Sequence, residues 1–181
     1  MYRVLLFFTF FSSTLFAQQT QKYIERQGRV TFFSYTSVEN IEANNDQVLS
    51  FFEPSTNSVA VSILMNAFKF KKSLMYNHFN ESYIESDLYP KATFEGVING
   101  YDPNSDRTQT KIIKGKITLR DISKDIEIKS KITREDSGYR ITGNLSLNID
   151  DFNIKVPALL APNIAKTIAI SFEFKYGFYE K

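Results

Sequence analysis

The octapeptide DIEIKSKI at residues 125–132 decides the class of fold. Its odd positions are all charged, whereas its even positions carry Ile126, Ile128, Ser130 and Ile132. A period of two places successive side chains on opposite faces of a β-strand, so that one face is buried and the other meets water. The stretch therefore predicts an amphipathic strand, which we extend to residues 124–133.

The same alternation recurs along the chain, and β-branched and aromatic residues fill it. The further candidate strands are 29–35, 48–53, 58–65, 92–98, 116–120, 141–149 and 168–176. Short polar turns follow several of them, at 53–57, 102–106, 121–124 and 135–138. Connections this short join antiparallel neighbours and not parallel strands. The sequence thus predicts an all-β fold of about eight antiparallel strands.

Two segments interrupt the alternation. Residues 70–79 place Leu74, Met75, His78 and Phe79 at the spacing of a short helical face. Residues 157–166 are a second helix candidate, which Pro162 interrupts. We therefore expect one or two short helices beside the strands.

An antiparallel sheet with one apolar face can hide its edges as a closed barrel or as a two-sheet sandwich. Only the barrel leaves a lumen, and eight strands give an interior that side chains fill or that holds one small ligand. A barrel would permit a binding function, such as that of a carrier, without proving one. The sandwich, with a solid core, predicts a structural or interaction protein, and the alternation alone leaves both open.

The first seventeen residues differ from the rest of the chain. Arg3 is their one charge, and the apolar run 4–11 leads to Ser12, Ser13 and Ala17. This pattern is typical of a secretory signal peptide, and the run is shorter than the roughly 18 residues of a membrane span. We expect cleavage near Ala17, one domain over 18–181, no integral membrane span, and a periplasmic or secreted protein; an uncleaved anchor is the alternative.

Charge and cysteine content narrow the function classes. The chain has 22 basic and 20 acidic residues, a balance that gives no reason to expect nucleic acid or an anionic membrane surface as a partner. It has no Cys, so burial of apolar area has to stabilise the fold without disulfides. No glycine-rich phosphate loop occurs, and we expect no cofactor.

Catalytic and metal sites find little support in the residue pattern. His78 is the only His, and the nearby Ser82, Ser86 and Asp87 are close to it only in sequence. With no Cys and one His, a metal site would need carboxylates such as those of 81–87, and these are also typical of an ordinary solvent-exposed face. We therefore predict no catalytic residues, no metal site and no enzyme; a hydrolase or isomerase on the same barrel is a third hypothesis without a residue constellation behind it.

Three blocks carry a family resemblance. They are residues 68–96, which contain YPKATF at 89–94, residues 115–128, GKITLRDISKDIEI, and residues 151–154, DFNI. In this order and spacing they resemble the polyisoprenoid-binding YceI-like family. Arg120 stands where the family often has His, and Asp121 and Asn153 stand where Gly is common. Because Asn and Asp tolerate left-handed backbone, we expect these turns to survive, whereas a polar role of the usual His does not carry over.

The resemblance implies an extended lipocalin-like barrel, export to the periplasm, and a polyisoprenoid or similar apolar lipid in the lumen. The inward positions of the strands and the apolar face of the first helix then form the predicted lining set; the part of it in 68–79 is either a mouth over the lumen or core packing. The predicted lining set is Phe32, Val61, Ile63, Phe68, Leu74, Met75, His78, Phe79, Phe94, Ile117, Leu119, Ile126, Ile128, Leu145, Leu147, Phe152, Ile170 and Phe172. The oligomeric state stays open, with a homodimer among the alternatives.

Overall fold

A computed structural model describes residues 21–36, 38–158 and 161–179 of the chain. The predicted signal peptide, 1–17, and its cleavage position lie outside the described residues. Within the described part, no helix combines the length and the apolar character that crossing a bilayer requires.

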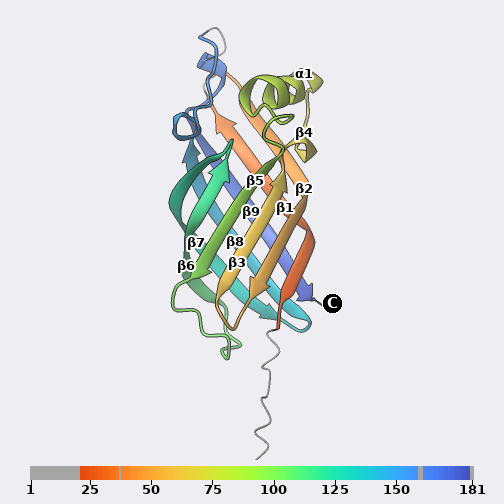
Figure 1. Cartoon of the computed structure of the whole chain (residues 1–181), viewed down its shortest axis with the longest axis vertical. Coiled ribbons are helices and arrows are strands. Elements are labelled where there is room, and N and C mark those ends of the chain that lie inside the picture. The colour runs from red at the N-terminus through yellow and green to blue at the C-terminus, as the bar shows by residue number, and fades with distance from the viewer. Residues whose placement is uncertain (1–20, 37, 159–160, 180–181) are drawn as a thin grey trace, which may run out of the picture.

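Eight antiparallel strands form a closed barrel (Figure 1). They are β1 (Tyr23–Tyr35), β2 (Asn40–Glu53), β3 (Ser58–Leu64), β5 (Lys91–Ile98), β6 (Gln109–Leu119), β7 (Ile122–Glu135), β8 (Gly138–Asn148) and β9 (Thr167–Phe178). They pair in the order β1-β9-β8-β7-β6-β5-β3-β2, and a pairing of β1 with β2 closes the ring. A ninth short strand, β4 (Lys69–Phe70), pairs with β2. The predicted all-β barrel is confirmed, and the two-sheet architecture is excluded.

Several strands begin earlier than the alternation predicts. The β2 strand starts at Asn40 and not near Val48, and β1 and β6 are extended in the same way. The inward positions of this part of β2 carry Ile41, then Ala43 and Asn45, both fully buried, so the alternation of large apolar residues breaks off after Ile41. The Nδ2 atom of Asn45 donates a hydrogen bond to the carbonyl oxygen of Leu64 at 2.8 Å, which satisfies the buried amide.

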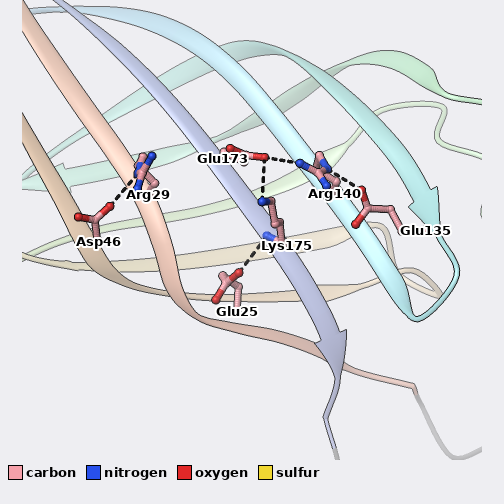
Figure 2. Close-up of polar contacts among 7 residues, drawn as sticks. All are labelled: Glu25, Arg29, Asp46, Glu135, Arg140, Glu173 and Lys175. Carbon is pink, nitrogen blue, oxygen red and sulfur yellow. Dashed lines mark hydrogen bonds and ion pairs between the residues drawn. The ribbon is translucent and has the colours of Figure 1, made fainter.

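The outward positions form a charged surface (Figure 2). Arg140 on β8 contacts Glu135 and Glu173 on the two neighbouring strands, each at 2.5 Å, and Arg29 on β1 contacts Asp46 on β2 at 2.7 Å. Solvent screens such pairs, so they mark the wet face of the barrel and add little to its stability.

The turns with unusual residues keep their geometry. Arg120 and Asp121 link β6 to β7 with φ values of 50° and 58°, and Asn153 has a φ of 53°. Two successive left-handed residues are what a tight two-residue hairpin requires. The expectation that Asp121 and Asn153 preserve these turns is confirmed.

Helical turns cover one end of the barrel, called here the roof end (Figure 1). The helix predicted over 70–79 begins only at Ser73, because β4 takes Phe70 into the sheet. This helix, α1 (Ser73–Asn77), continues into the π-helix η2 (His78–Tyr83). The hydrogen bond from the Ile84 amide to the Phe79 carbonyl, 2.9 Å long, closes the wide π turn.

The other helical turns are shorter than predicted or were not predicted. The second candidate, 157–166, contains only the 3-10 turn η4 (Ala161–Asn163); two prolines without amide hydrogens limit a longer helix there, and residues 159–160 lie outside the described part. Two more 3-10 turns, η1 (Met65–Ala67) and η3 (Ile149–Phe152), follow β3 and β8. The hairpin turn between β2 and β3 and the C-terminus lie at the opposite end, the floor end.

Candidate functional site

The barrel encloses a cavity of about 390 Å³. Apolar side chains from all eight barrel strands form its wall, because the inward phase of each strand carries Ile, Leu, Val or Phe. Ligand pockets commonly have volumes of about 300–1,000 Å³. The interior is therefore hollow over part of its height and is large enough for a ligand.

Aromatic packing closes the floor end. Phe52 is fully buried, and its ring centroid lies 5.1 Å from that of Tyr139 and 5.8 Å from those of Tyr101 and Tyr176. The hydroxyl of Tyr176 shares a 2.6 Å hydrogen bond with Ser50 Oγ, and burial raises the pKa of Tyr176 above its ordinary value. None of these residues lines the cavity. They form a solid floor beneath it.

Phenyl rings also gather at the roof end. Phe32, Phe68, Phe70 and Phe79 pack with centroid distances of 5.1–5.7 Å for the pairs in contact, and all four line the cavity. Leu74 on α1 lines the cavity too, although it is 63% exposed. The cavity therefore reaches the surface beside α1.

Polar lining residues lie at this same roof end. They are Ser34, Glu39, Lys72, His78, Tyr83, Asn148 and Asn163. Lys72 Nζ contacts Glu39 Oε1 at 2.5 Å, so these two charges compensate each other at the mouth. The rings of His78 and Tyr83 lie 6.4 Å apart, and burial raises the pKa of Tyr83. This arrangement suits a ligand that has an apolar chain deep in the lumen and a polar group near α1.

The predicted lining set can be compared directly with the cavity wall. All eighteen of its residues lie on the wall, including His78. In the segment 68–79, Phe68 is buried in the core, whereas Leu74 is exposed at the mouth, so the segment contributes to both. That they contact a ligand stays a prediction. Val30 and Phe174 also line the cavity, and the period of two from Phe32 and Phe172 could have found them. Ile154, Val156 and Ile164 lie in irregular segments, where no period could reveal them.

A family model described as the YceI-like domain matches residues 15–176. The chain belongs to the YceI-like family. No curated protein matches the sequence.

Solved structures of low sequence identity share the fold of this YceI-like domain. A polyisoprenoid binding domain from Saccharophagus degradans is 12% identical, with a TM-score of 0.72 and coverage of 89% of this chain and 100% of the other. BcnA of Burkholderia cenocepacia is 16% identical, with a TM-score of 0.68 and coverage of 81% and 94%. The YceI protein of Campylobacter jejuni is 14% identical, with a TM-score of 0.55 and full coverage of both chains.

Arg120 joins the three sequence blocks that carry the resemblance. Its Nη1 atom donates to the Asn153 carbonyl at 2.9 Å, its Nη2 atom pairs with the Glu85 carboxylate, and its guanidinium lies over the Tyr89 ring, 5.4 Å from the centroid. Sequence reasoning assigned no role to this side chain. In this YceI-like domain it fastens two roof segments to the turn between β6 and β7.

The residues weighed for catalysis do not form a triad. Ser82 and Asp87 are exposed, Ser86 is buried, and among the described residues no hydrogen bond joins any of them to His78. Within the same part of the chain, no group of three or more His, Cys, Asp or Glu side chains is placed to hold a metal ion. Glu85 instead pairs with Arg120.

Proposed function

We propose that this YceI-like domain is a binding protein, not an enzyme, and that it holds one apolar lipid chain, such as a polyisoprenoid, in the barrel lumen. The cavity of about 390 Å³ with its apolar wall carries the proposal. Each buried methylene gains about 0.8 kcal/mol, so such a wall binds a hydrocarbon chain without a charged site. Ordering a flexible chain opposes this gain, so affinity does not follow from area alone. The polyisoprenoid binding domain with the same fold supports the choice of ligand class.

Native mass spectrometry of the purified protein, followed by organic extraction, tests this function. A co-purifying prenyl lipid or similar apolar chain is the expected result. An empty extract, together with no uptake of added prenyl alcohol by the purified protein, would favour the interaction protein that presents its loops to a partner. A transfer assay then separates storage from transport: a transport protein passes its lipid to an acceptor membrane, whereas a storage protein retains it.

We further propose export to the periplasm or beyond, with the signal peptide removed. The motivation is the apolar run 4–11 and the polar residues that follow Ala17. N-terminal sequencing of the protein from its host is expected to return a start near Gln18, with the protein in the periplasmic or culture fraction. Recovery of a chain that begins at Met1 in the membrane pellet would contradict this.

The replacement His78→Ala is expected to leave lipid retention nearly intact. His78 is one polar residue at the roof end, whereas apolar side chains of every barrel strand form the wall. Because apolar area dominates the binding of a hydrocarbon chain, we expect a change in affinity below about threefold. Isothermal titration with a prenyl alcohol measures it. A loss of about a hundredfold would instead identify His78 as part of a headgroup site.

A further inference from the structure

Four glycines occupy inward-facing positions of the barrel strands, and a phenyl ring lies close to each of them. Gly28, Gly96, Gly115 and Gly143 belong to β1, β5, β6 and β8. A methyl group added at any of the four would lie 2.5–2.7 Å from a ring carbon of Phe94, Phe172 or Phe174. The three rings line the cavity and the four glycines do not. Each ring therefore lies against a part of the wall that has no side chain beneath it.

Gly143 is the clearest of these seats. It pairs with Phe172 across β8 and β9. An added Cβ would lie 2.6 Å from Phe172 Cζ, 2.8 Å from Phe172 Cε1 and 2.8 Å from Ser130 Oγ, and these three nearest atoms all belong to side chains. The hydroxyl of Ser130 can rotate away. The ring has to move as a whole.

The surroundings of Phe172 decide the direction of that movement. Its ring is stacked on Phe174, with 5.1 Å between centroids and 25° between planes. Phe174 in turn lies against Gly28 and is almost fully buried. The barrel wall lies behind Phe172, and its stacked neighbour Phe174 blocks movement along β9 toward the floor end. A displaced ring therefore enters the lumen.

We infer that Gly143 sets the width of the lumen and makes it wide enough for a methyl-branched chain. This inference rests on the proposed function. An eight-stranded barrel is only just wide enough for its own side chains, so free space inside it depends on rings that lie close against the wall. A branched isoprenoid chain is thicker than an unbranched one of equal length. A ring that leaves its seat excludes the branched chain first.

Gly143→Ala tests the inference with two probes, farnesol and dodecanol, whose main chains have equal length and which share a terminal hydroxyl. Affinities are measured by isothermal titration on lipid-free protein. Because an overfilled interior is costly, we expect the variant to lose about tenfold in affinity for farnesol and less than about threefold for dodecanol. The double variant Gly143→Ala with Phe172→Leu, which removes the ring, is expected to restore farnesol binding.

Gly177→Ala is the matched control, because an added methyl group there meets no atom within 4 Å. It is expected to leave both affinities unchanged. Equal losses for the two alcohols in Gly143→Ala, or a double variant that does not recover, would overturn the inference while the proposed function stands. Should Gly143→Ala not fold, Phe172→Leu alone decides: a higher ratio of farnesol to dodecanol affinity supports the inference, and an unchanged ratio refutes it. A native protein that binds neither alcohol refutes both proposals.

Discussion

Replacing Ile128 by Lys is expected to empty the lumen while the barrel stays folded. Ile128 is 5% exposed, faces Ile113 across β6 and β7, and lines the cavity. A Lys at this position has to lose its proton or draw water among apolar walls, and either outcome removes the advantage of burying a hydrocarbon chain. The hollow interior gives the long side chain room to reach water, which a packed core would not. We expect lipid affinity to fall by at least about a hundredfold.

The matched control is Lys129→Ile on the outer face of the same strand. Lys129 is exposed, so the change adds apolar surface to solvent and should leave lipid content unchanged. Circular dichroism establishes that both variants are folded before native mass spectrometry counts the bound lipid. If Ile128→Lys kept its lipid and Lys129→Ile lost it, the inward face of β7 would be assigned incorrectly.

Replacing Phe52 by Ala is expected to cost about 3–5 kcal/mol of the free energy of unfolding, as for other large aromatic residues in packed cores. Phe52 is fully buried and touches the rings of Tyr101, Tyr139 and Tyr176, so its removal leaves a void in the solid floor. Guanidinium denaturation followed by circular dichroism measures the loss.

Phe51→Ala is the control for this change, because Phe51 is the next residue of β2 and points to the opposite, partly exposed face. Its expected cost is about 1 kcal/mol, near the average for point substitutions. Equal costs at the two positions would contradict the assignment of a tightly packed floor.

The sequence predicted the strands best where inward apolar side chains alternate with outward charges. Ile126 and Ile128 are the clearest case, and the structure places both on the cavity wall. The early part of β2 was missed because Ile41 is followed at the inward positions by Ala43 and Asn45, whose burial depends on hydrogen bonds and neighbours distant in sequence. Period alone cannot contain such information.

Whether the barrel is hollow could not be predicted from alternation. The period of two assigns a face to each side chain but does not say whether the facing side chains meet. Phe52 fills the floor, whereas Phe172 lies against Gly143 and leaves space beside it. These opposite outcomes for the same residue type follow from pairing partners across strands, which become known only when the register is known.

The seam between β1 and β9 joins the first strand of the barrel to the last, with Tyr23 opposite Phe178. Contacts between segments so far apart cost loop-closure entropy and form slowly during folding. Until β9 docks, the facing edges of β1 and β8 are unpaired, and unpaired edges recruit other chains. The folding chain is therefore most prone to aggregate just before β9 docks and closes the ring.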